Sequence, residues 1–183
     1  QCIGVNLKIS SRYFEGNHFT SIESYTLGGF WDTVNLRNNN LQELPDGLFS
    51  DQTDSERIVL SIDLANNQIR KVSPSTFKGL KECYSLSLAS NKLNDESLPN
   101  DLLVNVTLGS LIDLSMNELT KFPKELLRTQ NQLVHLYLQR NHITALDETM
   151  FKGLHSLASL YIYQNPIMQM ADFQFFETTL ELL

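Results

Sequence analysis

The sequence predicts an α/β solenoid built around a parallel β-sheet, and three observations support this class. The frame LxxLxLxxNxLxxLxxxxFxxL fits residues 133–154. Its asparagine recurs along the chain at intervals of 28, 24, 26, 24 and 24 residues, a period typical of solenoids. Because the apolar spacing fits neither one helix nor one strand, each unit must turn back on itself. The recurring asparagines are Asn39, Asn67, Asn91, Asn117, Asn141 and Asn165.

Positions 3 to 7 of each unit alternate with a period of two, as in a strand. The apolar residues at positions 4 and 6 therefore point inward, and positions 3, 5 and 7 point outward. Proline fixes φ and removes a hydrogen-bond donor, so it suits an irregular return segment better than a ladder strand. We expect short helical or extended turns on this return side, which carries Pro45, Pro74, Pro99 and Pro123.

The chain is expected to form one domain over residues 1–183. A degenerate N-terminal capping repeat is predicted over 1–30, with Arg12 at an inward position 4 and Asn17 at position 9. Six repeats follow over 31–175, and 176–183 form a truncated or makeshift C-terminal end. Terminal repeats are atypical because they must close the core against water.

Two repeats depart from the common frame. In the third, Asp101 stands where a phenylalanine is expected, so Leu98, Leu102 or Leu103 should fill the interior instead. The polar run 50–57 after the first repeat accounts for the longest interval. We expect it to be a solvated loop, since added loop length costs little free energy.

Each recurring asparagine lies where the chain leaves its strand. An amide side chain both donates and accepts hydrogen bonds, and buried backbone groups at such a corner need partners. A column of asparagines can supply those partners coil after coil. We therefore assign these residues a structural role.

Composition limits the classes of partner. The chain has 14 basic and 21 acidic residues, a net charge of −7, which argues against nucleic acid or an anionic membrane surface. No apolar run approaches the roughly 20 residues that cross a bilayer, so no direct membrane insertion is expected within this chain. Because the chain begins with Gln1, we expect a processed or excised product.

The two cysteines are not expected to pair. Cys2 lies about three coils before Cys83, and a strand spacing of roughly 4.8 Å separates them by roughly 15 Å. A disulfide needs Cα atoms within about 7 Å. Cys83, at an inward position, should be a buried thiol, and Cys2 is interpreted as a remnant of a missing N-terminal cap.

The outward side chains of the predicted sheet are unevenly distributed. Small residues dominate the middle coils, whereas the fifth and sixth coils carry tyrosines, which are enriched with arginine at binding hot spots. This pattern suggests a ligand on the C-terminal half, although the tyrosines could instead cover the end of the sheet or a following repeat. Candidate ligand-binding residues are Arg37, Asp63, Leu111, Asp113, Met116, His135, Tyr137, Gln139, Arg140, Tyr161 and Tyr163.

Catalytic and metal-dependent functions find little support. Asp113, Ser115 and His135 lie on adjacent predicted strands, but an open sheet supplies neither an oxyanion hole nor a dry pocket. The histidines lack metal-ligand spacing, and no cofactor is expected. One modification motif is present, because Asn105-Val106-Thr107 is an acceptor for N-glycosylation.

The LxxLxLxxN block resembles the leucine-rich repeat superfamily, and its period is similar to the typical, about 24-residue, extracellular subtype. The resemblance implies a right-handed horseshoe with a parallel concave sheet and an irregular or short-helical convex side. It also implies a non-enzymatic, secreted or cell-surface recognition module that binds a protein or peptide through the concave face. The alternative is an intracellular scaffold for protein–protein assembly.

Overall fold

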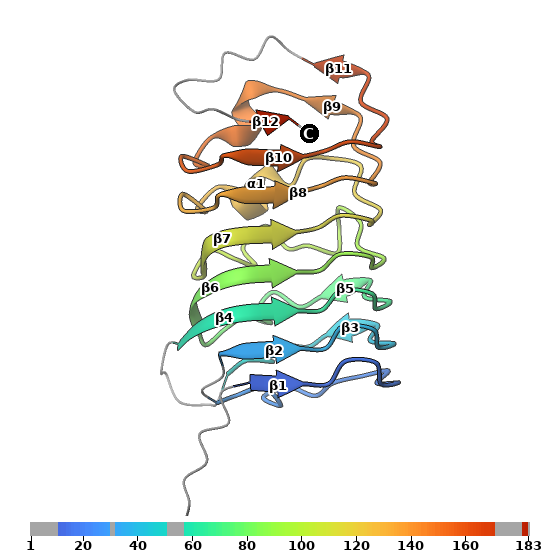
Figure 1. Cartoon of the computed structure of the whole chain (residues 1–183), viewed down its shortest axis with the longest axis vertical. Helices are drawn as coiled ribbons and strands as arrows, with labels where there is room; N and C mark the ends of the chain where they lie inside the picture. The colour runs from blue at the N-terminus through green and yellow to red at the C-terminus, as the bar shows by residue number, and fades with distance from the viewer. Residues whose placement is uncertain (1–10, 30–31, 51–56, 171–180, 183) are drawn as a thin grey trace, which may run out of the picture.

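The structure is a computed structural model that describes residues 11–29, 32–50, 57–170 and 181–182 of the chain. Its main feature is an eight-stranded parallel sheet in the order β1-β2-β4-β6-β7-β8-β10-β12, stacked along the long axis of the molecule (Figure 1). The strands are β1 (Ser11–Tyr13), β2 (Thr33–Asn35), β4 (Arg57–Asp63), β6 (Leu80–Ser87), β7 (Thr107–Asp113), β8 (His135–Tyr137), β10 (Ser159–Tyr161) and β12 (Glu181–Leu182). The predicted solenoid is confirmed.

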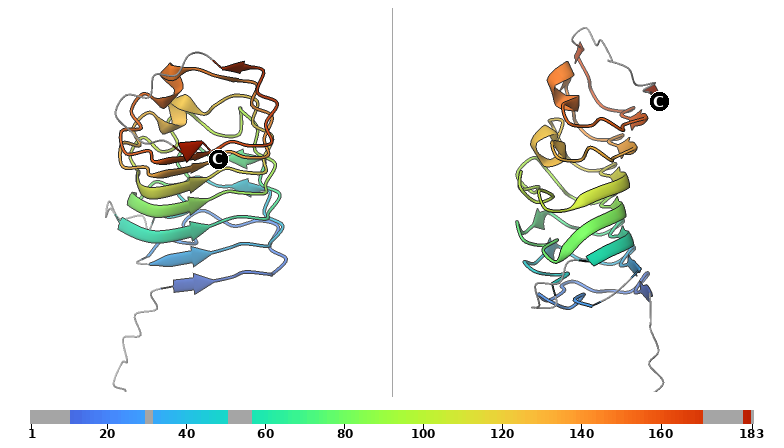
Figure 2. Two further views of the ribbon diagram at one scale, coloured as in Figure 1. Left: turned by 45° about the horizontal axis from the view of Figure 1, so that its top comes forward. Right: turned by 90° about the vertical axis from the view of Figure 1, so that its left-hand side faces the viewer.

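The return segments lie opposite the main sheet, as Figure 2 shows in its right-hand view. They hold a short helix, α1 (Lys124–Leu127), and a 3-10 turn, η1 (Glu148–Phe151). Two small parallel sheets add extended turns: β3 (Glu43–Leu44) with β5 (Lys71–Val72), and β9 (Ala145–Leu146) with β11 (Gln169–Met170). The irregular, short-helical convex side is therefore present as expected.

Inward side chains of successive strands stack directly on one another. At position 4 the register pairs Val34 with Ile62, Ile62 with Leu86, Leu86 with Ile112 and Ile112 with Leu136, and all five are buried. Each such side chain contributes roughly 1.5–3 kcal/mol once its apolar area leaves water. A single coil cannot bury this face, so the stability of the core is shared between neighbours.

The irregular third repeat is filled as the sequence predicts. Asp101 is exposed, whereas Leu98, Leu102 and Leu103 are all buried in the core. In the N-terminal segment, Arg12 of β1 pairs with Val34 of β2, which places it at position 4.

The prediction that residues 50–57 form a solvated loop is wrong at both ends of the segment. Residues 51–56 lie outside the described residues. Ser50 is buried, and Arg57 is the buried first residue of β4. The Nη1 atom of Arg57 donates to the carbonyl of Phe49 at 2.7 Å. The physical reason is that β4, β6 and β7 begin before the strand segment of the frame, which draws Arg57 into the sheet.

Cys83 is a buried free thiol, as predicted, and Cys2 lies outside the described residues. The Sγ of Cys83 donates a hydrogen bond to the carbonyl of Ser85 at 3.2 Å. Burial disfavours the thiolate and raises the pKa of Cys83 to about 12. The thiol is therefore protonated at neutral pH and a poor nucleophile.

The recurring asparagines join each coil to the one before it. Asn91 shows the pattern: its Nδ2 donates to Leu64 O of the preceding coil at 3.1 Å and to Leu88 O of its own coil at 3.0 Å. Its Oδ1 accepts the backbone N–H of Ile69 at 3.0 Å. The same donor and acceptor bonds to the preceding coil occur at Asn39, Asn67, Asn117, Asn141 and Asn165.

We predict that Asn91→Leu lowers the free energy of unfolding by at least about 2 kcal/mol, because it leaves buried backbone groups of two coils without partners. Urea unfolding followed by circular dichroism measures the change. The control Asn100→Leu replaces an exposed asparagine and should stay within about 0.5 kcal/mol of the parent. Equal effects of the two substitutions would contradict the structural role of Asn91.

Candidate functional site

The outward face of the eight-stranded sheet is the concave face, and its side chains form rows that run across the strands. The central row comprises Tyr13, Asn35, Asp63, Ser87, Asp113, Tyr137 and Tyr161, each directly opposite the next. A second row places Leu111, His135 and Ser159 opposite one another. All the sequence-predicted contact residues therefore lie on this face or at its rim.

Two of the candidates, Arg37 and Asp63, form an ion pair with each other. The Arg37 Nη1 atom lies 3.7 Å from Asp63 Oδ2, and Asp63 Oδ1 accepts the backbone N–H of Ala65 at 2.9 Å. Both residues belong to the first two repeats, several strands away from Tyr137 and Tyr161. They are thus separate from the C-terminal candidates.

Tyr137 and Tyr161 form a face-to-face stack. Their ring centroids are 4.3 Å apart and the ring planes differ by only 3°. The stack follows from the register, because Tyr161 pairs directly with Tyr137 and adjacent strands lie about 4.8 Å apart. Sequence spacing predicted that the two residues are neighbours, and the structure adds the parallel ring geometry.

The environment of Tyr137 disfavours its ionised form. Burial is the largest cause that raises the pKa of Tyr137, followed by Tyr161 and then by the negative charge of Asp113. Asp113 is opposite Tyr137 on β7, and its Oδ1 accepts the backbone N–H of Ser115 at 2.9 Å. The phenol is therefore a neutral, amphipathic contact group over the physiological range.

Two polar atoms beside this stack have no protein partner. They are Nδ1 of His135 and Oε1 of Gln139, both shielded from solvent. An unsatisfied polar atom in such a position costs free energy. Together with Asp113, Tyr137 and Tyr161, these two residues form what we call the C-terminal site.

Three other candidates lie at its rim. Met116 and Arg140 both have positive φ, 56° and 58°, so they sit in the turns that follow β7 and β8. Arg140 Nε donates to Gln164 Oε1 at 2.6 Å, and Met116 Sδ accepts the Ser90 hydroxyl at 3.2 Å. Tyr163, also at the strand exit, is 47% exposed. The rim is therefore a mixture of apolar, aromatic and basic groups.

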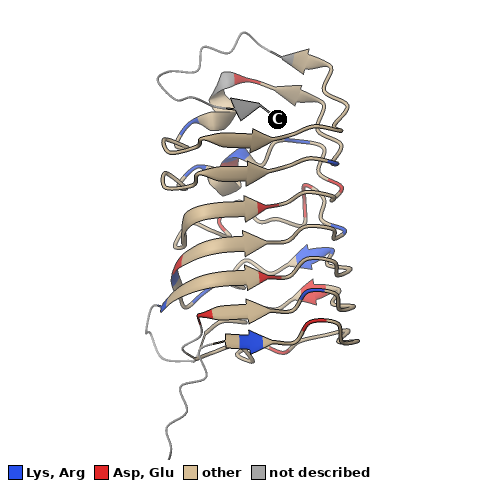
Figure 3. Cartoon of the chain, in the orientation of Figure 1, with Lys and Arg blue, Asp and Glu red and all other residues tan. Residues whose placement is uncertain are grey.

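Charge is scarce on the C-terminal strands. Figure 3 shows no acidic or basic residue on β8 or β10, whereas β4 and β7 each end in an acidic one. Those two residues are Asp63 and Asp113. Within the described part of the chain, Asp63 has a cationic partner and Asp113 has none.

Sequence analysis missed an exposed apolar cluster at the leading ends of the long strands. Ile58 and Leu60 of β4 and Tyr84 of β6 are each more than half exposed. Gly109 of β7 lies against Tyr84, whose Cδ2 would be 3.0 Å from a Cβ at that position. The sequence signal is the apolar run of residues 58–60 directly after the polar insertion.

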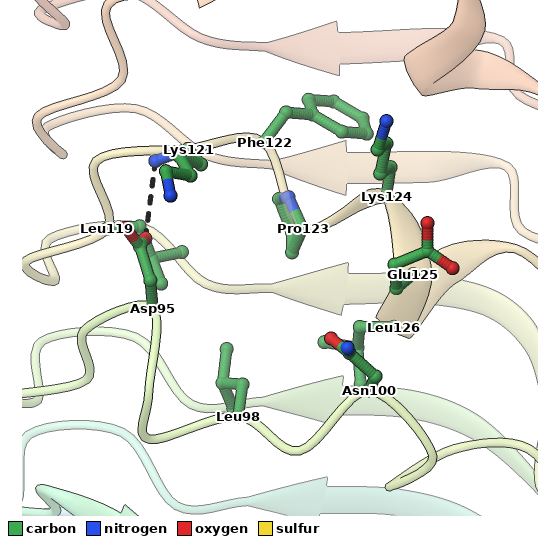
Figure 4. Close-up of a pocket in the computed structure, with 10 residues that line it drawn as sticks. All are labelled: Asp95, Leu98, Asn100, Leu119, Lys121, Phe122, Pro123, Lys124, Glu125 and Leu126. Atoms are coloured by element: carbon green, nitrogen blue, oxygen red, sulfur yellow. Dashed lines mark hydrogen bonds between the residues drawn. The ribbon is translucent and has the colours of Figure 1, made fainter.

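A pocket on the convex side is lined by residues whose interactions are structural. Figure 4 shows Asp95 and Lys121 at one end and Pro123 with α1 at the other. Burial raises the pKa of Asp95, but hydrogen bonds from the Thr120 hydroxyl and from two backbone N–H groups outweigh it and leave the pKa below its usual range. The carboxylate therefore serves to join two turns.

Asp113, Ser115 and His135 are not arranged as a catalytic triad. The carboxylate of Asp113 bonds to the backbone of Ser115, which is itself buried, and His135 stands in a different row. Among the described residues no three His, Cys, Asp or Glu side chains gather as metal ligands. In that same part of the chain no helix is long and apolar enough to cross a membrane. Asn105 of the glycosylation motif is exposed in the turn before β7.

Comparison with known proteins identifies the repeats. The profile of the family described as leucine rich repeat matches residues 32–93 and 110–167. Mouse podocan is 30% identical over 155 residues, covering 73% of this chain and 25% of podocan. Chicken lumican is 32% identical over 118 residues, covering 64% of this chain and 31% of lumican. The chain thus spans about a quarter to a third of these relatives.

Solved structures share the fold. The leucine-rich repeat protein FLRT2, in a complex with latrophilin 3 and Unc5D, is similar with a TM-score of 0.68 at 22% identity, covering 89% of this chain and 48% of that one. Drosophila Toll in its complex with Spatzle has a TM-score of 0.60 at 22% identity, covering 88% of this chain and 24% of that one.

We predict that Asp113→Asn lowers the pKa of Tyr137, because the substitution removes a negative charge that opposes formation of the tyrosinate. NMR of tyrosine labelled with ¹³C at the ring Cζ, followed through the alkaline range, measures the ionisation. Asp63→Asn is the control: it alters the same row but a carboxylate that faces Arg37. A pKa of Tyr137 that responds to Asp63→Asn and not to Asp113→Asn would contradict the geometry of the site.

Proposed function

Because this chain belongs to the leucine-rich repeat family, we propose that it is a non-enzymatic recognition module of a secreted or cell-surface protein. Its partner is a protein or peptide that docks on the concave face around the C-terminal site. The relatives podocan, lumican and osteomodulin are secreted or cell-surface proteins, which supports an extracellular location over an intracellular scaffold.

The observation that carries the proposal is the stacked pair Tyr137–Tyr161, next to middle coils whose outward side chains are mostly small. Tyrosine offers a large amphipathic contact area for little lost rotamer freedom, and here the stack has already fixed the rings. The middle of the same row has only Ser87 beside Asp113. A partner segment can therefore lie across the middle coils and end against the tyrosine rings.

Two further observations are consistent with a protein partner. FLRT2 and Toll, which share the fold, were solved in complexes with other proteins. The net charge of −7 disfavours nucleic acid. The exposed Asn105 remains the proposed glycan acceptor, and it lies before the leading end of β7 whereas Tyr137 ends β8.

We predict that Tyr137→Ala and Tyr161→Ala each weaken binding of a selected ligand by about tenfold or more, the effect of losing an interface hot spot. The ligand is a set of 12-residue peptides selected from a random phage library on the immobilised parent chain. Isothermal titration calorimetry of synthetic peptides gives the dissociation constants, and circular dichroism checks the fold of each variant.

Tyr84→Ala is the matched control, because Tyr84 is an exposed tyrosine on the same sheet but outside the C-terminal site. It should leave the dissociation constants within about twofold. Peptides that lose affinity for Tyr84→Ala, or that bind Tyr137→Ala as tightly as the parent, would refute the proposed location.

A further inference from the structure

We propose that the C-terminal site recognises a cationic side chain of its partner, an arginine, which stacks on the free face of Tyr137 and pairs with the carboxylate of Asp113. This inference rests on the proposed function and adds the chemistry of the group recognised. It follows from the orientation of one ring and from the charge beside it.

The orientation of Tyr137 is set by its stack with Tyr161. A centroid separation of 4.3 Å with parallel planes requires face-to-face contact, and the two residues are directly paired on β8 and β10. The ring normals therefore run from strand to strand. One face of Tyr137 is covered by Tyr161, and the other points back toward β7.

The residue that this free face meets is Asp113, which the register places opposite Tyr137. A planar group stacked on the ring lies about 4 Å from it, close to the strand spacing of about 4.8 Å. It would therefore rest directly above the Asp113 side chain. The negative charge of Asp113 is also one of the causes that raise the pKa of Tyr137, after burial and Tyr161.

The carboxylate of Asp113 can accept further hydrogen bonds and an ion pair. One oxygen, Oδ1, accepts the Ser115 N–H, and no Lys or Arg of the described chain lies within ion-pair distance. Asp63 is the counterpart of Asp113 in the same row. It makes the equivalent hydrogen bond to Ala65 and in addition forms an ion pair with Arg37. At Asp113 the place of that arginine is open.

Among the described residues, no cation of the chain itself fills this place. Arg140, at the rim, is held by Gln164, and Arg37 is held by Asp63. Next along the row from Asp113 is Ser87, which is too short to cover it.

Arginine fits this arrangement better than lysine. Its guanidinium is planar, stacks on aromatic faces and still presents N–H donors in its plane to a carboxylate. A lysine ammonium can pair with Asp113 but has no flat face to lay on the ring. The site is thus suited to an exposed arginine on an extended segment of a partner protein.

The test uses the whole chain and two small probes, N-acetyl-arginine methylamide and its neutral isostere N-acetyl-citrulline methylamide. NMR of ¹³C-labelled tyrosine rings and aspartate carboxylates follows each titration up to tens of millimolar. The arginine probe should shift the signals of Tyr137 and Asp113 and saturate. The citrulline probe should bind at least about fivefold more weakly.

Substitutions test which carboxylate pairs with the arginine probe. Asp113→Asn keeps the acceptor for the Ser115 N–H and should weaken arginine binding by about fivefold or more, whereas the control Asp63→Asn should leave it unchanged. Equal binding of citrulline, or no effect of Asp113→Asn, would overturn the inference. The inference would also be overturned if the arginine probe left the Tyr137 ring signal unshifted while the selected peptides still depended on Tyr137. In that case the proposed function would stand. Loss of Tyr137 dependence among the peptides would overturn the proposed function itself.

Discussion

The hydrogen bonds of the asparagine column are the interaction on which the rest of the structure depends. Each side chain satisfies a buried N–H and a buried carbonyl of the preceding coil while also bonding to its own coil. A leucine would fill the same space and leave these groups unpaired. The column therefore fixes where the six strands β2, β4, β6, β7, β8 and β10 end, and with it the register between them. Apolar stacking supplies most of the free energy, but it tolerates sliding in a way that paired amides do not.

The C-terminal site is a consequence of that register. Tyr137 and Tyr161 occupy equivalent positions in consecutive coils, and the common register puts their rings at stacking distance. Asp113 lies opposite Tyr137 on β7 for the same reason. Recognition would thus use a rigid surface, whose aromatic groups are ordered before any partner arrives, so little entropy is lost on binding.

Periodic features of this molecule could be predicted from the sequence, and features that depend on side-chain packing could not. The spacing of Asn39 to Asn165 predicts the coils, and alternation about Leu136 predicts which residues face outward. The buried Arg57 escaped prediction because a charged residue in a polar run normally faces water, and only the early start of β4 draws it inside. Likewise the sequence places Arg37 and Asp63 on one face, but their pairing depends on rotamers that no repeat pattern encodes.

A crystal structure of the chain with one of its selected peptides tests the central claim most directly, namely that the C-terminal half of the concave face is a recognition surface prepared by the repeat register. The account predicts a peptide lying along the outward rows, with a guanidinium stacked on Tyr137 and paired with Asp113. A peptide seated on the convex side, around Phe122 and α1, or on the apolar cluster at Tyr84 would contradict it.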